Sequence, residues 1–294
     1  MTFAEYATQW TTTVLPLSKP ATVATMKSHL KTLNAGLGAH PLDVAYPVVQ
    51  AVFTDLSLKH APKTVRNIHS SYHNIMSAAV REGVIAKVPK IALPKAVRTE
   101  QEWLDLDAMK RIIIDSRSTH RPLYALLAET GLRIGEALGL QEQDINATNR
   151  TLQVQRSVYN GKVQSPKTQS AYRTLALSPK LTDILADKLS GNPGDFLFKS
   201  VTGTPLWPDK ILLRDLHPLL KDLKLEPVGF HAFRRGNATL LCSVLGCPEK
   251  IAAYRLGHQA PGLTLGLYAQ SWCDIDREWG PRIGAALFGG GSNG

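Results

Sequence analysis

The chain has 294 residues, a formal net charge of +10, 44% hydrophobic residues and 20% charged residues. The length suits two domains, and the composition is that of a globular protein, which excludes a disordered or membrane-spanning chain. No apolar run of about 18 residues and no signal-like N-terminus occurs, so no membrane association is expected. The basic balance favours a polyanionic partner, with nucleic acid the first choice.

The cysteines indicate the redox compartment. Cys242, Cys247 and Cys273 are odd in number, and their spacing fits neither a paired disulfide framework nor a four-ligand zinc site. We therefore predict three buried thiols in a reducing cytosol.

The first 83 residues predict a helical domain. Pro20 and Pro62 stand where helices can begin, because proline in the first turn loses no hydrogen bond. Between Pro62 and Gly83, apolar residues recur at steps of three and four, which indicates one buried helical face: Val65, Ile68, Tyr72, Ile75, Met76, Ala79 and Val80. Residues 84–97 hold two prolines and three lysines without helical period, so a linker is predicted there.

The net positive charge is concentrated in the smaller, N-terminal domain. Residues 1–96 hold ten Lys and Arg against four Asp and Glu, a net charge of +6. Basic residues on or beside the predicted helices are candidates for DNA phosphate contacts: Lys27, Lys31, Lys63 and Arg66. For any single residue of this set, a solvated helical surface is the alternative.

Residues 98–288 predict a second domain of mixed type, with a disordered tail at 289–294. Helices are predicted at 104–116, 121–130, 179–188, 208–223, 231–245 and 248–256, and another around Tyr268. Strands are predicted at 151–158, from Lys162 onward, and at 172–177, with a hairpin turn at Asn160-Gly161. The predicted fold class is therefore mainly α with a small antiparallel β-sheet.

An arginine in an apolar setting is the first chemical feature. In TGLRIGEAL, Arg133 lies among apolar and small residues, and Glu136 follows three positions later. A buried guanidinium needs a partner, since leaving it unpaired is costly. An ion pair with Glu136 and the binding of an external anion are equally supported.

Three further clusters are weak when taken singly. Lys167 follows the hairpin and would by itself be a solvated turn residue. His231 and Arg234 are three apart and share a helical face, as a helix-capping histidine beside a surface arginine also would. His258, in Leu-Gly-His, and Tyr268, ten residues later, would singly be a core histidine and a core aromatic residue.

The order of these clusters resembles a known family. The family is that of the tyrosine recombinases, or phage integrases. Its first arginine box is similar to TGLRIGEALG, and its second box is similar to FHAFRRGNATLL with LGHQAPGLTLGLY. TVRNIHSSYHNIMSAAVREGVIAKVP is similar to the end of that family's core-binding domain, so the resemblance covers nearly the whole chain. It implies a helical, SAM-like core-binding domain and an α+β catalytic domain that together clamp a DNA duplex.

The resemblance also implies a role for each matching residue. Tyr268 is the implied nucleophile, which attacks a DNA phosphodiester to leave a 3'-phosphotyrosyl enzyme and a free 5'-hydroxyl. Arg133 and Arg234 clamp the non-bridging oxygens of the scissile phosphate, and Lys167 protonates the departing 5'-oxygen. Tyr254 is the one nearby competitor for the nucleophile, but its position does not fit the family pattern.

Further roles concern the surroundings of the phosphate. His231 and His258 assist proton transfer and hydrogen-bond the phosphate, while Glu136 holds Arg133 or a histidine in place. Arg173, in the segment that follows Lys167, is added to the candidate DNA contacts. No metal and no nucleotide cofactor is expected, because arginine, lysine and histidine carry the charge neutralisation.

The implied function is site-specific DNA recombination through a Holliday junction. The implied partners are double-stranded core sites with inverted repeats and three further copies of the chain in a homotetramer, in the cytoplasm and associated with the nucleoid. Because the chain begins with the core-binding region, we expect it to recognise only simple core sites. The need for an accessory directionality factor stays open.

Two other functions and one docking question also stay open. A type IB topoisomerase-like enzyme shares this chemistry but reseals the original strand, and a catalytically silent DNA-binding regulator keeps the fold. Residues 283–288 form an apolar C-terminal segment, which either docks on an adjacent subunit or packs on its own domain.

Overall fold

The computed structural model describes residues 1–95, 102–116, 119–165, 172–257 and 276–289. The chain divides into two compact units, Met1–Glu100 and Gln101–Gly294. Each unit has its own hydrophobic core.

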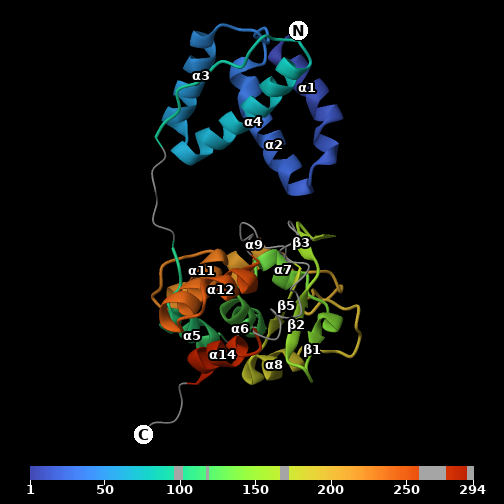
Figure 1. The fold of residues 1–294 in the computed structure, drawn as a ribbon, viewed down its shortest axis with the longest axis vertical. Coiled ribbons are helices and arrows are strands. Elements are labelled where there is room, and N and C mark those ends of the chain that lie inside the picture. Colours follow the sequence, from blue (N-terminus) through green and yellow to red (C-terminus); the bar gives the residue numbers. More distant parts are fainter. Residues whose placement is uncertain (96–101, 117–118, 166–171, 258–275, 290–294) are drawn as a thin grey trace. The chain divides into compact units, whose positions relative to one another are not determined.

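Unit 1 is helical (Figure 1). Within residues 1–95 its elements are α1 (Phe3–Thr13), the 3-10 turn η1 (Leu15–Leu17), α2 (Pro20–Leu37), α3 (Tyr46–Lys59) and α4 (Pro62–Arg81). The helix starts predicted at Pro20 and Pro62 are confirmed. After α4 the chain turns at Gly83, which has a φ of +72° in the region that favours glycine.

The apolar face of α4 lies in the core of unit 1. Tyr72 on this face stacks on Phe3 of α1 and meets Phe53 of α3 edge-on. The predicted linker differs from the structure in its first part, because Ile85 and Ile91 are buried in the same core. Apolar side chains can be buried without a helix, so this stretch belongs to the core of unit 1.

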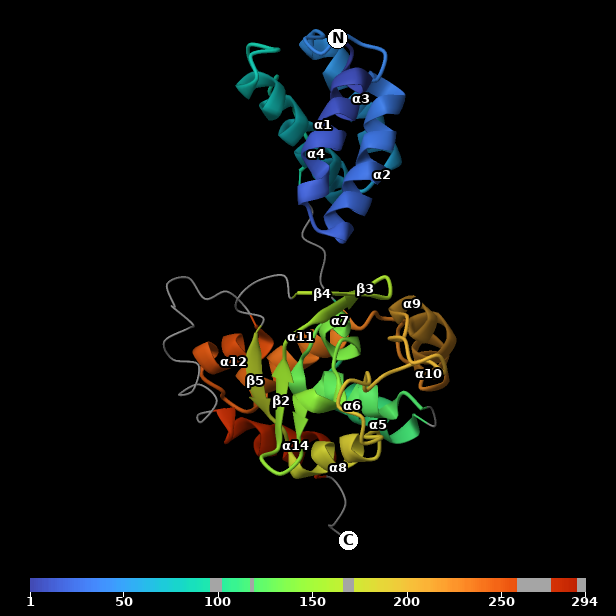
Figure 2. The same cartoon turned by 90° about the vertical axis from the view of Figure 1, so that its right-hand side faces the viewer.

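Unit 2 is built around a central helix, α6 (Arg121–Thr130), in which residues 123–130 are all buried (Figure 2). Helix α6 contacts α5 (Leu106–Asp115), α7 (Ile134–Leu138), α8 (Pro179–Ala186), α11 (His231–Thr239) and α14 (Trp279–Phe288). The other helical elements are η2 (Glu142–Asp144), α9 (Pro208–Ile211), η4 (Leu212–Leu216), α10 (His217–Asp222), η5 (Leu240–Val244) and α12 (Glu249–Leu256).

A small antiparallel sheet lies beside these helices. Its strand order is β1 (Ile145–Asn146), β2 (Thr151–Val154), β5 (Arg173–Ala176), with Leu152 opposite Leu175. A separate hairpin pairs β3 (Ser157–Tyr159) with β4 (Lys162–Gln164). Asn160 and Gly161 at its turn have φ of +47° and +72°, the left-handed pair that this dipeptide predicts. The predicted fold class, mainly α with a small antiparallel sheet, is confirmed.

Two predicted helices contain π-helical turns. The helix predicted over 208–223 is instead the succession α9, η4 and α10, with η4 a π-helix. Pro218 has no N–H to donate to the carbonyl of Arg214, so the regular ladder cannot continue through this point. The helix predicted over 231–245 also passes into a π-helix, from α11 to η5, but this stretch contains no proline.

The C-terminal helix packs on its own unit. Trp279, Ile283 and Leu287 of α14 lie in the core of unit 2. Docking of residues 283–288 on an adjacent subunit stays an expectation, whereas Ile283 and Leu287 of the single chain pack on their own domain. The reason is that Gly280 and Gly284 let α14 approach the chain at Ala176 and Ser178 closely.

The cysteines differ in part from the prediction. Cys247 is buried as predicted, Cys242 on η5 is exposed, and Cys273 lies outside the described residues. Within the described ranges, every helix is too short or too polar to cross a bilayer.

Candidate active site

Arg133 is placed by a sharp turn after the central helix. Gly131, with a left-handed φ of +62°, ends α6, and Arg133 becomes the residue that caps α7. Its backbone N–H and its Nη1 donate to Oε2 and Oε1 of Glu136 at 3.1 and 2.8 Å. The side chain is 42% exposed. The ion pair is thus present, and the guanidinium remains accessible to an external anion.

Glu136 is a buried carboxylate between two guanidinium groups. Its Oε2 also accepts a hydrogen bond from Nη2 of Arg173 at 3.0 Å. Burial opposes the ionisation of Glu136, but the charges of Arg173 and Arg133 outweigh it and lower the pKa of this carboxyl group. Glu136 is therefore charged, and its hydrogen bonds hold Arg133 in place.

Arg173 does not lie where a DNA contact requires it. Its side chain is fully buried, so the predicted phosphate contact is corrected. Burial lowers its pKa, an effect that the neighbouring Glu136 carboxylate opposes. The guanidinium can be buried because Glu136 neutralises it and the carbonyl of Arg255 accepts from its Nε at 2.7 Å.

Arg234 is the second arginine of the site. It is buried on α11, where its Nη1 donates to the carbonyl of Gly131 at 2.8 Å and its Nη2 donates to that of Leu256. Burial and the nearby charge of Arg133 lower its pKa to about 10. Among the described residues no carboxylate bonds to it, so an anion in front of it would be strongly favoured.

His231 stands at the first turn of α11, three residues before Arg234. Partial burial and the positive charges of Arg234, Arg235 and Arg133 lower its pKa. The structure therefore brings His231, Arg234 and Arg133 into one positively charged cluster. A neutral imidazole beside two guanidinium groups can accept or relay a proton.

Lys167, His258 and Tyr268 lie outside the described residues. Residues that flank their segments are described. Arg173 follows the segment with Lys167 and contacts Glu136 and the carbonyl of Arg255.

The segment with His258 and Tyr268 is flanked by a second buried ion pair. Nη1 of Arg255 donates to Oδ1 of Asp276 at 2.6 Å, and both side chains are fully buried. Oδ2 of Asp276 accepts from the backbone N–H of Ala176 on β5 at 2.6 Å. Arg255 and Asp276, which are described on either side of this segment, are therefore both bonded to Ala176 of β5, the strand that carries Arg173.

The sequence reasoning missed Arg255 and Asp276. Arg255 directly precedes the Leu-Gly-His motif, and a charged residue at the buried end of a helix was the one signal available. The competitor Tyr254 has a structural contact, since its hydroxyl donates to the carbonyl of Thr174 at 2.8 Å.

The basic candidates of unit 1 are on its surface. Lys27 and Lys31 are exposed on α2, four residues apart on one face, and Lys63 and Arg66 are exposed at the start of α4. Arg66 also donates from its Nε to the carbonyl of Pro94 at 3.0 Å. All four side chains are therefore exposed enough to contact a phosphate group.

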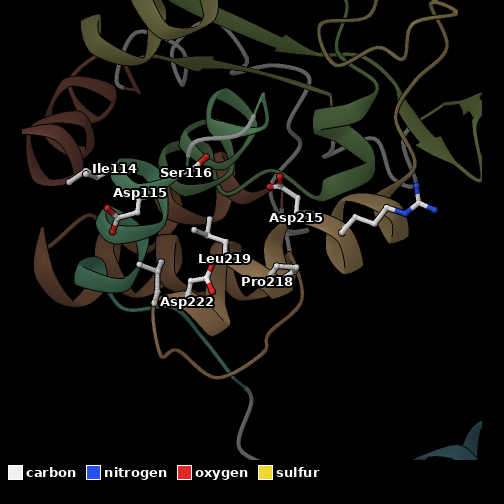
Figure 3. Close-up of a pocket in the computed structure, with 9 residues that line it drawn as sticks. Ile114, Asp115, Ser116, Asp215, Pro218, Leu219 and Asp222 are labelled. Carbon is white, nitrogen blue, oxygen red and sulfur yellow. The ribbon is translucent and has the colours of Figure 1, made fainter.

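A pocket of about 570 Å³ in unit 2 is lined by more acidic than basic side chains (Figure 3). It lies at α5, η4 and α10, and Asp115, Asp215 and Asp222 are among the residues that line it. Arg214 also lines the pocket, but three carboxylates outnumber its single guanidinium, so the lining as a whole repels a phosphate group. The arginine cluster therefore suits an anion better than this pocket does. Within the part of the chain that the structure covers, no group of three His, Cys, Asp or Glu is arranged to hold a metal ion.

Comparison with known proteins agrees with the resemblance found in the sequence. The model of the phage integrase family matches residues 102–272. A tyrosine recombinase XerC-like protein of Caldanaerobacter subterraneus is 25% identical over 91% of this chain and 79% of that protein. The ICEBs1 integrase of Bacillus subtilis is 27% identical over 75% of this chain and 65% of its own length.

Solved structures share the fold. The Tn1549 transposon integrase in complex with a circular intermediate DNA has a TM-score of 0.76 at 20% identity, over 95% of this chain and 99% of that one. A lambda integrase tetramer bound to a Holliday junction has a TM-score of 0.71 at 19% identity, over 89% of this chain and 79% of that one.

Proposed function

The chain belongs to the phage integrase family, and we propose that it is a site-specific DNA recombinase that cleaves and rejoins strands through a 3'-phosphotyrosyl intermediate and a Holliday junction. Its proposed substrates are duplex core sites with inverted repeats, bound by four copies of the chain. The DNA and the Holliday junction in the structures of similar integrases support these substrates. The observation that carries the proposal is one cationic cluster, in which the partly exposed Arg133 and the exposed His231 lie beside the buried Arg234, whose Nη1 is bonded to the carbonyl of Gly131.

The two arginines bind the scissile phosphate. Phosphoryl transfer concentrates negative charge on the non-bridging oxygens, and a planar guanidinium can donate two parallel hydrogen bonds to them. Arg133 supplies an exposed guanidinium held by Glu136, and Arg234 supplies a buried one held by two carbonyls. Fixed donors of this kind need no rearrangement during the reaction, which is why they stabilise the transition state.

Tyr268 is the proposed nucleophile. Its phenolic oxygen attacks phosphorus, the bond from phosphorus to the 5'-oxygen breaks, and the ester to tyrosine keeps the energy of the broken bond. Lys167 protonates the departing 5'-oxygen, while His231 and His258 assist proton transfer. The 5'-hydroxyl of a partner duplex then attacks the ester, which releases Tyr268 and joins the strands.

Replacement of Tyr268 tests the nucleophile. Tyr268→Phe removes the attacking oxygen only, so we expect no covalent adduct and nearly unchanged DNA affinity. The measurement is adduct formation on a denaturing gel, with a nicked half-site built from inverted repeats that flank the gene. Tyr254→Phe is the matched control: it loses the hydrogen bonds to Thr174, should lower stability by about 1 kcal/mol, and should still form the adduct.

Other outcomes would contradict the proposal. An adduct formed by Tyr268→Phe would assign the nucleophile to another residue. A chain that binds the duplex but forms no adduct would be a DNA-binding regulator. Relaxation of supercoiled plasmid, without any joined product between two sites, would favour the topoisomerase-like enzyme.

A further inference from the structure

Arg133 and Arg234 are linked by a closed ring of contacts. Arg234 donates to a carbonyl two residues before Arg133 and to a carbonyl at the end of α12, while Arg133 is held by Glu136. The members of the ring, in order, are Gly131, Arg133, Glu136, Arg173, Arg255, Leu256 and Arg234. The last contact returns from Arg234 to Gly131, so the positions of the two arginines depend on each other.

Arg173 closes this ring. Its Nη2 donates to the carboxylate that holds Arg133, and its Nε donates to the carbonyl of Arg255, next to the Leu256 carbonyl that holds Arg234. The two nitrogens of one rigid, buried guanidinium therefore join the support of one arginine to the support of the other. Without Arg173, the described contacts leave Gly131 as the remaining link between them.

We propose that Arg173 is a positioning residue for strand cleavage: it sets the spacing of Arg133 and Arg234, acting through Glu136 and the carbonyl of Arg255. This inference rests on the proposed function. It assigns to Arg173 no contact with DNA, because the side chain is fully buried.

The geometry also indicates which substitution is informative. Lysine keeps the positive charge but presents one ammonium group, which cannot reproduce two donors in a fixed planar fork. Arg173→Lys should therefore keep the charge balance of Glu136 and lose the bridge to the Arg255 carbonyl. A change in the cleavage rate of this variant then reports the positions of Arg133 and Arg234 and not the loss of a charge at residue 173.

The measurement is the single-turnover cleavage rate of the nicked half-site at saturating protein, expressed per folded molecule. Arg173→Lys should lower this rate by about 10- to 100-fold, the usual effect of losing a group that orients another. The DNA affinity of this variant should stay within about twofold of that of the unmodified chain, because the buried Arg173 side chain does not contact DNA. In an Arg133→Lys background the same substitution should cost less than about threefold, since the spacing to Arg133 no longer matters.

Arg156→Lys is the matched control. Arg156 forms an ion pair with the buried carboxylate of Asp144 in the same unit, outside the ring. It should lower the unfolding midpoint and leave the cleavage rate per folded molecule unchanged. Glu136→Gln provides a second variant should Arg173→Lys fold poorly: it weakens the contact through which Arg173 acts on Arg133, so it should also lower the cleavage rate per folded molecule.

The results separate the two proposals. Cleavage by Arg173→Lys at the unmodified rate, or an equal loss in both backgrounds, would overturn the positioning role while the recombinase assignment stands. Failure of the unmodified chain to form an adduct would overturn both.

Discussion

Glu129 is a fully buried carboxyl group in the central helix, four residues before Arg133 in the sequence. Its two oxygens accept hydrogen bonds from the backbone N–H and the hydroxyl of Ser178 at 2.7 and 2.6 Å. Burial raises its pKa to about 7, although the hydrogen bonds of Ser178 and the charge of Arg255 act in the opposite direction. The group therefore takes up its charge within the neutral pH range.

This raised pKa predicts a pH-dependent stability. The folded chain holds the Glu129 proton up to a pH of about 7, whereas the unfolded chain releases it near the ordinary pKa of 4.5. The stabilisation is complete below the lower value and is lost as the pH rises to the upper one. Glu129→Gln stays neutral and keeps a partner for Ser178, so the stability of unmodified chain relative to Glu129→Gln should fall from pH ~5 to pH ~8.

Urea unfolding of both chains at the two pH values measures the difference. Glu226→Gln, at an exposed position, serves as the control and should shift the midpoint equally at both pH values. An unchanged difference between the unmodified chain and Glu129→Gln would show that the carboxyl group titrates in its ordinary range.

At the scale of elements, α14 is held by contact of its backbone with the start of α8. A Cβ atom added at Gly284 would lie 2.1 Å from the Cβ of Ser178, and one added at Gly280 would lie 2.7 Å from the carbonyl oxygen of Ala176. Ser178 caps α8 and also binds Glu129. The two glycines therefore bring the C-terminal helix onto the polar network behind the site.

Gly284→Ala should destabilise unit 2 by about 1–3 kcal/mol, the usual range for overpacking, because neither backbone can yield without disturbing the cap of α8. Chemical denaturation measures the loss. Ala285→Ser, at the exposed neighbouring position, should cost no more than about 0.5 kcal/mol from helix propensity. Equal stability of the two variants would contradict close packing of α14 in solution.

The charge of the whole molecule governs its affinity for DNA. With a net charge of +10 and exposed lysines on unit 1, binding should release counterions and weaken steeply with salt. Lys27 and Lys31 share one face of α2 and are the first candidates for phosphate contacts.

Replacing both lysines by glutamine should reduce the slope of log affinity against log salt by about 2, since each phosphate contact contributes about 0.9. Fluorescence anisotropy over about 50 to 200 mM KCl measures the slope. Lys59→Gln is the control: Asp55, 2.7 Å from the ammonium group of Lys59, already offsets its charge, and the slope should hardly change. A slope unaffected by the double substitution would exclude this face from contact with DNA.

Several local elements and the family could be predicted from the sequence alone. The starts of α2 and α4 follow from proline at the first helical position, and the turn of the β3–β4 hairpin follows from Asn160-Gly161. These features depend on neighbouring residues only. The ordered motifs around Arg133 and Arg234 were likewise enough to recognise the integrase family.

The pairing of buried charged side chains could be read from the tertiary structure alone. Arg173 and Glu136 are 37 residues apart, and Arg255 and Asp276 are 21 apart. No periodicity in the sequence relates such positions, so Arg173 was predicted at the DNA surface and the Arg255–Asp276 pair was missed. A charge can be buried only where the fold supplies its partner, and that partner comes from another element of the chain.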